Sequence, residues 1–525
     1  MKVGVSRALQ LAAVLVIASA SNVLARAVDN NTYDRQREAL VAQDYSNLIG
    51  SSVVLTSEEE LANQILVALK QQELDDALDS SNYPPARNFL VSKPDIERSQ
   101  VFSFIRSMPK GAVLHGHDTG LTSINFVVQN LTYWDGLYIC YLDYGPIFKF
   151  SASPPSEGAC PDAWSLVSTE RAAASSPSDF DAALYKNLTM GVDNPLEAYP
   201  DVDAAWVRFN QYFASMDGIL SYRAAFEAYH TQTLTEMRDD GVTYLEFRGV
   251  LPLLHELDGT VLTAQQTIAV YKNISDIFVS DNPEFFGARF IYGPPRGVSV
   301  EQVFAYVDLV KALKTEFPEY IAGFDLVGQE DPGPPLKDFI EPLLTLQDSD
   351  PAIDVFYHAA ETDWYGEDAD ENLFDALLLN ATRIGHGYGI LKHPALMQRA
   401  RDTATPIEIC PVSNQVLRLV EDLRNHPGVA LAASGFPMVV SSDDPAPWAA
   451  LPLSHDFYEA FMALGGRHAD LRFLKQLAIN SINFSSLPAI QKASLLQLWT
   501  EQWSNFITSV IIKYQSIHTN LIPED

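Results

Sequence analysis

Short apolar runs rich in β-branched residues alternate with longer helix-prone stretches between residue 109 and about residue 445. An alternation of strand and helix predicts a parallel sheet, and eight such units predict a (β/α)8 barrel. The expected fold class is therefore α/β, of the TIM-barrel type. The eight runs are Ala112–His117, Val242–Arg248, Ala288–Gly293, Ile321–Gly328, Asp354–Glu361, Arg383–Gly387, Pro406–Pro411 and Met438–Asp444.

Helix-prone sequence precedes and follows this pattern. Residues 26–105 form a predicted helical N-terminal region, in which Ser57–Leu78 has apolar residues at helical spacing. The barrel is predicted over residues 106–490 and a C-terminal helical segment over 491–525. The stretch from about 125 to 200 is too long for one connecting helix and is rich in Gly, Pro and Ser, which predicts an inserted subdomain after the first strand. A helix over Ala204–Asp240 would then complete the first unit.

The first 25 residues have the pattern of a secretory signal peptide. Lys2 and Arg7 precede an apolar run over residues 8–18, and small residues at 18–20 and 23–25 offer cleavage sites. The run is too short to span a membrane comfortably, so we expect a soluble, secreted protein without a membrane span. Six Asn-x-Ser/Thr sequences fit this destination as glycosylation candidates: Asn30, Asn130, Asn187, Asn273, Asn380 and Asn483.

The chain has only three cysteines. Cys140 and Cys160 lie close together in the predicted insertion, where they can form a disulfide in an oxidising compartment. Cys410 lies within the apolar run Pro406–Pro411 and is predicted to be a buried thiol rather than a nucleophile.

The net charge of −32 restricts the possible partners. Acidic residues number 67 against 35 basic residues, and the chain has no Lys/Arg cluster and no Gly-rich phosphate loop. Nucleic-acid binding requires a basic surface, so no nucleic-acid partner is expected.

The strongest chemical signal is the sequence Leu114-His-Gly-His117 at the end of the first predicted strand. Residues i and i+2 of a strand point the same way, so the imidazoles of His115 and His117 can reach one ion. Imidazole pairs of this kind suit zinc or another borderline metal. Alone, the pair is only a moderate indication of a metal site.

Further histidines and carboxylates end other predicted strands. His358 and Glu361 follow the fifth run, His386 lies between two glycines, and Asp443 and Asp444 end the last run. Each has an ordinary structural explanation when taken singly, such as a core histidine or a helix N-cap. Because active sites of such barrels lie at the carboxyl ends of the strands, their joint occurrence favours a site with three histidines and an aspartate holding a metal ion.

These motifs, in this order, resemble the adenosine deaminases, and in particular their secreted branch, the adenosine deaminase-related growth factors. The resemblance covers nearly the whole mature chain. It includes the signal peptide, the helical N-terminal region and the disulfide-bearing insertion. The motifs that carry it are Met108-Pro-Lys-Gly-Ala-Val-Leu-His-Gly-His117, His358-Ala-Ala-Glu361, Ile384-Gly-His-Gly387, Cys410-Pro-Val-Ser-Asn-Gln-Val-Leu417, Asp422-Leu-Arg-Asn-His-Pro427, Ser441-Ser-Asp-Asp-Pro445 and Asp456-Phe-Tyr-Glu459.

The resemblance implies a role for each matching residue. One Zn²⁺ per subunit would be held by His115, His117, His358 and Asp443. Glu361 would protonate N1 of the purine, and His386 would hold and activate the hydroxide. Three further contacts are implied: Asp444 to N7, the backbone N–H of Gly328 to N3, and Asp118 with Trp206 to the ribose.

The implied reaction is the hydrolysis of adenosine to inosine and ammonia by a secreted enzyme. In this branch the N-terminal helices are linked to dimerisation and the insertion to receptor binding, so a homodimer and a cell-surface receptor or glycan are the expected partners. The chain departs from the pattern at Pro295, where animal members tend to carry a ribose-contacting histidine. Two alternatives stay open: a related amidohydrolase acting on another aminopurine nucleoside or nucleotide, and an extracellular adenosine-binding signalling protein.

Overall fold

The computed structural model describes residues 30–155, 160–161 and 163–515. The predicted signal peptide therefore lies outside the described residues, as does the end of the C-terminal segment. The chain separates into two compact units, residues 1–47 and 48–525. In the first unit the structure describes the helix α2 (Asn30–Tyr45). In the described part of the chain, no helix combines the length and apolar character that a membrane crossing requires.

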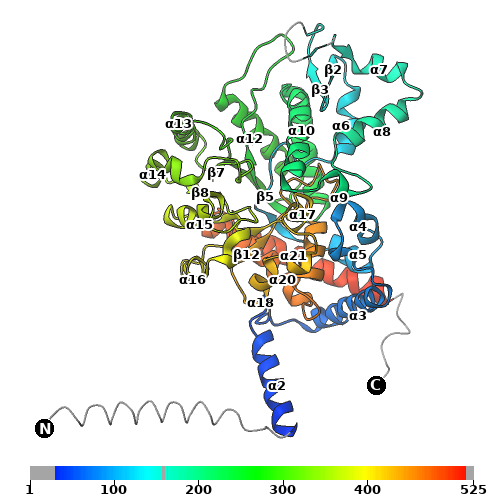
Figure 1. Ribbon diagram of the computed structural model, residues 1–525, viewed down its shortest axis with the longest axis vertical. Helices are drawn as coiled ribbons and strands as arrows, with labels where there is room; N and C mark the ends of the chain where they lie inside the picture. Colours follow the sequence, from blue (N-terminus) through cyan, green and yellow to red (C-terminus); the bar gives the residue numbers. More distant parts are fainter. Residues whose placement is uncertain (1–29, 156–159, 162, 516–525) are drawn as a thin grey trace, which may run out of the picture. The chain divides into compact units, whose positions relative to one another are not determined.

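A curled parallel sheet forms the centre of the second unit (Figure 1). Each of the eight predicted runs contributes to it, and the fifth run contributes two short strands. The strands are β1 (Gly111–Val113), β5 (Val242–Gly249), β6 (Gly287–Tyr292), β7 (Ile321–Phe324), β8 (Asp354–Val355), β9 (His358–Ala359), β10 (Ile384–His386), β11 (Ile407–Ile409) and β12 (Met438–Val440).

The sheet closes on itself through two junctions. Strands β1, β5, β6, β7 and β8 pair in that order, and β9, β10, β11 and β12 pair in that order, all in parallel. Strands β8 and β9 belong to one run, and an isolated parallel bridge between Gly116 and Asp443 joins the ends of the first and last runs. The α/β barrel predicted from the alternation is confirmed. Most residues of its strands are buried, as expected when helices cover the outer face.

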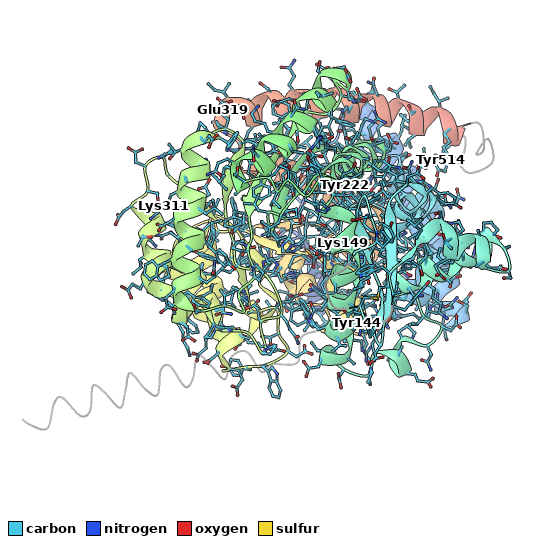
Figure 2. All side chains as sticks on the ribbon, turned by 90° about the horizontal axis from the view of Figure 1, so that it is seen from above. Tyr144, Lys149, Tyr222, Lys311, Glu319 and Tyr514 are labelled. Carbon is cyan, nitrogen blue, oxygen red and sulfur yellow. A yellow bond between two sulfur atoms is a disulfide. The ribbon has the colours of Figure 1, made fainter. Side chains whose placement is uncertain are left out.

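Helices follow the strands and surround the sheet (Figure 1). They are α10 (Val202–Leu220), α11 (Arg223–Asp239), α12 (Ala264–Asp281), α13 (Val300–Glu316), η4 (Leu336–Phe339), α14 (Ile340–Gln347), α15 (Asp368–Leu378), η5 (Tyr388–Lys392), α16 (Pro394–Asp402), α17 (Pro411–Val416), η6 (Leu423–Asn425), α18 (Gly428–Ala433), α19 (Ser454–Glu459), the π-helical η7 (Ala460–Leu464), α20 (Leu471–Asn483) and α21 (Ala489–Gln515). In the perpendicular view of Figure 2, α21 lies along one side and ends near Tyr514.

The single helix predicted over Ala204–Asp240 is two helices, α10 and α11. The chain leaves the helix at Ser221 and Tyr222, because the backbone there bonds to a neighbouring extended segment. The carbonyl of Ser221 accepts a hydrogen bond from the His255 N–H at 2.8 Å, and the Arg223 N–H donates to the His255 carbonyl at 3.0 Å. This tertiary pairing has no counterpart in the local sequence pattern, which reads as one helix.

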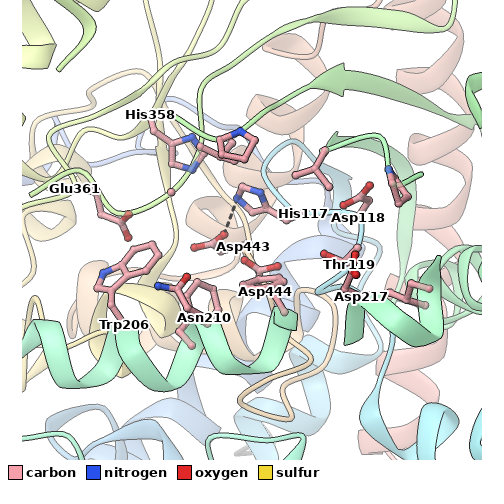
Figure 3. Close-up of a pocket in the computed structure, with 18 of the residues that line it drawn as sticks. His117, Asp118, Thr119, Trp206, Asn210, Asp217, His358, Glu361, Asp443 and Asp444 are labelled. Atoms are coloured by element: carbon pink, nitrogen blue, oxygen red, sulfur yellow. Dashed lines mark ion pairs between the residues drawn. The ribbon is translucent and has the colours of Figure 1, made fainter. Parts of the chain in front are cut away.

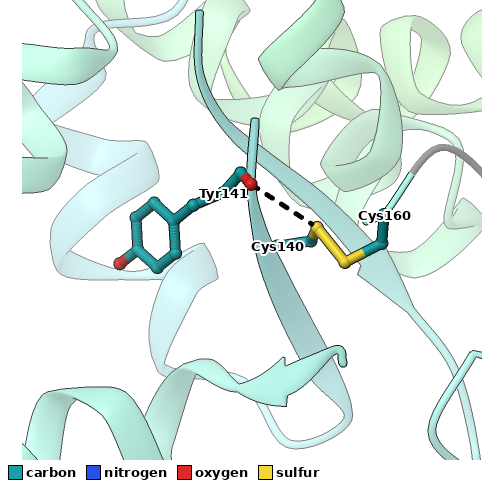
Figure 4. The surroundings of a disulfide bond; sticks show 3 residues. All are labelled: Cys140, Tyr141 and Cys160. Carbon is teal, nitrogen blue, oxygen red and sulfur yellow. Dashed lines mark hydrogen bonds between the residues drawn. A yellow bond between two sulfur atoms is a disulfide. The ribbon is translucent and has the colours of Figure 1, made fainter. Parts of the chain in front are cut away.

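The predicted insertion contains a three-stranded antiparallel sheet with the order β3-β2-β4. Its elements are α6 (Ile124–Gln129), η3 (Leu131–Tyr133), β2 (Leu137–Leu142), β3 (Gly145–Phe150), β4 (Ser165–Leu166), α7 (Val167–Ala173), α8 (Pro177–Asn187) and α9 (Pro195–Ala198). A disulfide joins Cys140 of β2 to Cys160 (Figure 4). Strand β3 packs so closely on α10 that a Cβ on Gly218 would lie 1.6 Å from the Phe148 carbonyl oxygen. The insertion thereby supports the helix that forms one wall of the cavity described below.

Most of the predicted N-terminal helical region packs within the second unit. It comprises α3 (Ser57–Ser80), η2 (Pro84–Ala86), α4 (Phe89–Ile96) and α5 (Gln100–Arg106). Helix α3 begins at a capping box in which Thr56 and Glu59 satisfy each other's backbone N–H groups. Glu59 also accepts hydrogen bonds from Lys475 of α20 and, at 2.6 Å, from Trp503 of α21. These contacts attach α3 to the helices that close the barrel.

Candidate active site

The four predicted metal ligands meet at the carboxyl ends of the barrel strands. His115 Nε2 and His117 Nε2 lie 3.6 and 3.2 Å from Asp443 Oδ1, and a ligand nitrogen of His358 lies within 4.8 Å of those of His115 and His117. In a tetrahedral site with zinc–ligand bonds of roughly 2.0–2.1 Å, ligand atoms are about 3.4 Å apart. The His117–Asp443 contact is drawn in Figure 3.

Hydrogen bonds from behind orient two of these imidazoles. His115 Nδ1 lies 2.7 Å from Glu408 Oε2, and His358 Nδ1 lies 2.7 Å from Asp325 Oδ2. Because a carboxylate accepts a hydrogen bond from each Nδ1–H group, the ring proton stays on Nδ1 and each Nε2 keeps a free lone pair that faces the other ligands. His115 Nε2 is buried and has no hydrogen-bond partner. A buried nitrogen lone pair without a hydrogen-bond partner is what a metal ion would accept in this position, so the four side chains can bind a metal ion.

The electrostatic setting also favours the neutral form of two of these imidazoles, His115 and His117. Burial, the positive charge of Arg248 and the neighbouring histidines hold the pKa of His115 well below its usual range. Burial likewise lowers the pKa of His117. A neutral imidazole is the form that coordinates a metal ion.

A buried charge network lies directly beneath the ligands, and its residues had no assigned role in the sequence patterns. The guanidinium of Arg248 bonds to Asp325 at 2.7 Å and to Glu408 at 2.6 Å. That of Arg383 bonds to Glu408 at 2.6 Å and to Glu246 at 2.8 Å. All five side chains are completely buried. The available signal was Glu408 itself, a charged residue in the middle of a strand whose neighbours are apolar.

Three residues at the strand ends have left-handed backbone conformations. They are Ala360 (φ 61°), His386 (φ 57°) and Asp443 (φ 58°). Such φ values are unfavourable for residues with a side chain and gather at functional sites. Each residue lies at the point where its run turns out of the barrel wall, so the turns direct Glu361, His386 and Asp443 toward one space.

That space is a cavity of about 280 Å³. Its walls bring together every predicted site residue except His115, which lies buried behind them. The predicted residues that line it are His117, Asp118, Trp206, Gly328, His358, Glu361, His386, Asp443 and Asp444 (Figure 3). Asn210 and Asp217, which no sequence motif indicates, also line the cavity, and Pro295 occupies its wall as well. Among the described residues lining the cavity, none is a lysine or an arginine.

Two carboxyl groups in the cavity have raised pKa values, whereas, despite burial, the neighbouring histidines hold the pKa of Asp443 well below its usual range. Burial and the charge of Asp443 raise the pKa of Glu361 well above its usual range, and the same two causes raise that of Asp444. Glu361 Oε1 and Asp444 Oδ1 are buried without hydrogen-bond partners. Both groups can therefore present a proton to a ligand in the cavity.

The position of Asp444 depends on a glycine across the site. A Cβ on Gly120 would lie 1.7 Å from Asp444 Oδ1, so no larger residue fits there while Asp444 keeps this place. Asp118 lies at the other end of the cavity, where its Oδ2 accepts a hydrogen bond from the Tyr271 hydroxyl. Burial raises the pKa of Asp118 to about 7.

The fold and the site together define a metal-dependent hydrolase of the (β/α)8 class. A sequence model of the family "Adenosine deaminase" matches residues 181–501, and one of "Adenosine/AMP deaminase N-terminal" matches residues 11–105. The chain belongs to the adenosine deaminase family and is a hydrolytic deaminase.

Its relatives extend over almost the whole chain. Adenosine deaminase 2 of Sus scrofa is 41% identical over 91% of this chain and 94% of its own length, and the Homo sapiens protein is 40% identical over the same shares. An adenosine deaminase of Phlebotomus duboscqi is 43% identical over 87% of this chain and 88% of its own.

Solved structures share the fold. Adenine deaminase from Arthrobacter aurescens has a TM-score of 0.54 at 20% identity and covers 76% of this chain and 99% of its own. An amidohydrolase from Burkhoderia ambifaria with bound Zn has a TM-score of 0.55 at 18% identity, covering 78% and 95%.

Proposed function

We propose that the protein is a secreted, zinc-dependent adenosine deaminase that hydrolyses adenosine, and 2′-deoxyadenosine, to inosine and ammonia. The observation that carries the proposal is the cluster of His115, His117, His358 and Asp443 beside the unpartnered carboxyl oxygens of Glu361 and Asp444. The names of the pig, human and sand-fly relatives support adenosine as the substrate.

Zinc is the metal that best fits the donor set. Three imidazoles and one carboxylate are ligands of intermediate softness, and the ligand spacing suits tetrahedral geometry. When bound, a zinc ion here supplies Lewis acidity that brings the pKa of a water molecule toward neutrality.

The residues around the cluster supply the proton transfers. Glu361 gives a proton to N1, which makes C6 electrophilic as the oxygen of water bonds to it. The C6–N6 bond then breaks and the amino group leaves as ammonia. Of the two protons of the water, one ends on N1 of inosine and the other leaves with the ammonia. Asp444, held protonated by burial, donates a hydrogen bond to N7.

The remaining walls of the cavity are suited to a neutral sugar. Asp118 and Trp206 are the proposed ribose contacts, and Gly328, with φ of 105°, offers its backbone N–H to N3. Because Asp217 adds a further carboxylate and no lysine or arginine is present among the described lining residues, a phosphate group would meet repulsion there. This observation ranks a nucleoside above the alternative nucleotide substrate.

Export, glycosylation and dimer formation are also part of the proposal. Five of the six sequon asparagines, at 130, 187, 273, 380 and 483, are exposed, which supports glycosylation, and the side chain of the sixth, Asn30, lies outside the described residues. The Cys140–Cys160 disulfide suits an oxidising compartment. A mass decrease on endoglycosidase treatment of protein recovered from culture medium would support export with glycans. Light scattering would distinguish the expected homodimer from a monomer.

The activity is tested by following the ultraviolet change from adenosine to inosine. We expect turnover that a chelator abolishes and zinc restores, and turnover of AMP far below that of adenosine. Glu361→Gln is expected to keep its zinc but to lose roughly 10²–10⁴-fold in kcat, the usual contribution of a general acid. Absence of turnover by zinc-loaded protein would overturn the adenosine deaminase assignment and favour an adenosine-binding protein. Faster turnover of AMP would favour a nucleotide deaminase.

A further inference from the structure

A chain of buried hydrogen bonds leads from a backbone N–H to the side chain of His386. The N–H of Gly428 donates to His426 Nδ1 at 2.8 Å, and His426 Nε2 lies 3.0 Å from Asn414 Oδ1. Asn414 Nδ2 lies 3.1 Å from His386 Nδ1. The three side chains are at most 2% exposed, so no solvent competes for these bonds.

The starting point of the chain fixes the direction of every bond in it. A backbone N–H can only donate, so His426 Nδ1 accepts and the ring proton of the neutral imidazole is on Nε2. Nε2–H then needs an acceptor, which places the amide oxygen of Asn414 toward His426 and its NH₂ group toward His386. The amide therefore donates to His386 Nδ1, and the single proton of the neutral His386 ring is on Nε2.

Local packing fixes the residues of this chain of hydrogen bonds. A Cβ on Gly428 would lie 2.8 Å from His426 Nδ1, so a glycine is required for the approach of its N–H. The Asn414 backbone carbonyl accepts N–H groups of Leu419 and Val420 at 2.9 and 3.3 Å. The competing partner of His386 Nδ1, Glu361 Oε1, is 3.6 Å away and takes part in no hydrogen bond.

We propose that Asn414 and His426 are positioning residues that fix His386 in its Nε2–H tautomer. His386 Nε2 lies 3.7 Å from Asp443 Oδ2, on the side of the metal ligands. An Nε2–H group there donates a hydrogen bond to the oxygen of the attacking water. This bond orients the water so that a lone pair of its oxygen faces C6. The Nε2–H tautomer has no free ring lone pair on this side with which to take a proton from that water, so the carboxylate of Glu361 takes it after Glu361 has given its own proton to N1. This inference rests on the proposed deaminase function and assigns His386 the part of a donor within it.

The tautomer can be measured without substrate. We would label the histidine ring nitrogens with ¹⁵N and record long-range ¹H–¹⁵N correlations for metal-free and zinc-loaded protein, using His386→Gln to assign the signal. Nε2–H on both His386 and His426 is the expected result. A proton on Nδ1 of His386 would overturn the inference, whether or not the protein deaminates adenosine.

Kinetics of matched variants test the connection to catalysis. His426→Gln keeps an acceptor for Gly428 and a donor for Asn414 and should retain most of kcat. His426→Phe and Asn414→Leu should each lose roughly 100-fold or more in kcat, as expected when a histidine takes the wrong tautomer. KM should stay within about threefold, since substrate contacts are intact. Asn425→Leu, the same change at the exposed neighbour of His426, is the control and should behave as wild type.

The outcomes separate the inference from the proposed function. If wild-type enzyme turns over adenosine while His426→Phe and His426→Gln have equal kcat at equal zinc content, the positioning role of His426 is overturned and the proposed function stands. If wild-type protein has no turnover but His386 carries its proton on Nε2, the proposed function is overturned and the tautomer assignment stands. Should a variant fail to fold, the measurement on the wild-type protein still decides the tautomer.

Discussion

Replacing Glu408 by glutamine is expected to weaken metal binding and destabilise the fold together. Its carboxylate accepts hydrogen bonds from His115 Nδ1 at 2.7 Å, Arg248 at 2.6 Å and Arg383 at 2.6 Å. Glutamine keeps the shape but loses the charge, and its NH₂ group must face one of these donors. Breaking a buried ion pair costs about 3–5 kcal/mol. Because Arg248 keeps Asp325 and Arg383 keeps Glu246, we expect the lower end, about 3 kcal/mol.

The metal site should respond separately. Loss of a carboxylate behind a histidine ligand lowers metal affinity by roughly 10–100-fold. Zinc affinity would be measured by competition with a chelator, and the free energy of unfolding by denaturant titration of the metal-free protein. Glu319→Gln removes the same charge from an exposed position and should change neither quantity. Wild-type zinc affinity in Glu408→Gln would refute the role of Glu408 in orienting His115, and an unchanged free energy of unfolding would refute the charge argument.

Two further predictions follow from buried contacts. Gly120→Ala should displace Asp444 and lower kcat/KM for adenosine by at least tenfold, about 1.4 kcal/mol. Gly297→Ala is the control, because a Cβ at Gly297 has nothing within 4 Å, and it should leave kcat/KM unchanged. Equal kcat/KM values for the two variants would contradict the steric argument. Burial lowers the pKa of His230 to about 3 from 6.5, so the unfolded chain binds one more proton between these values and stability is lost as pH falls through them. His230→Phe should reduce that slope by up to about 1.4 kcal/mol per pH unit in denaturant titrations, and an unaltered slope would show that His230 titrates normally.

The parts of the site that could be predicted are those whose chemistry is local in the sequence. His115 and His117 share one strand end, and the strand–helix alternation gave the barrel and hence the expectation that the strand ends converge. Contacts set by packing could not be predicted. His426, which follows η6, reaches Asn414 of α17 through a tertiary contact, and the break between α10 and α11 depends on a bond to His255. Glu408 stands out as a charge within an apolar strand, but its partners Arg248 and Arg383 could not be predicted, because charged residues inside a strand carry no periodic signal of what they contact.

Buried hydrogen bonds beneath the site hold residues whose backbone conformation is unfavourable. Left-handed backbone costs about 1 kcal/mol or more for a residue with a side chain. Glu330 accepts the N–H groups of Ala360 and Glu361 at 3.0 and 2.8 Å, which fixes the turn that aims Glu361. The N–H of Asp443 donates a hydrogen bond to the His115 carbonyl at 3.1 Å, so the backbones that carry these two metal ligands, at the ends of the first and last runs, fix each other's position. Because apolar residues of equal volume would stabilise a barrel core at least as well, the charges beneath the site are best explained by the geometry that they impose on the groups above them.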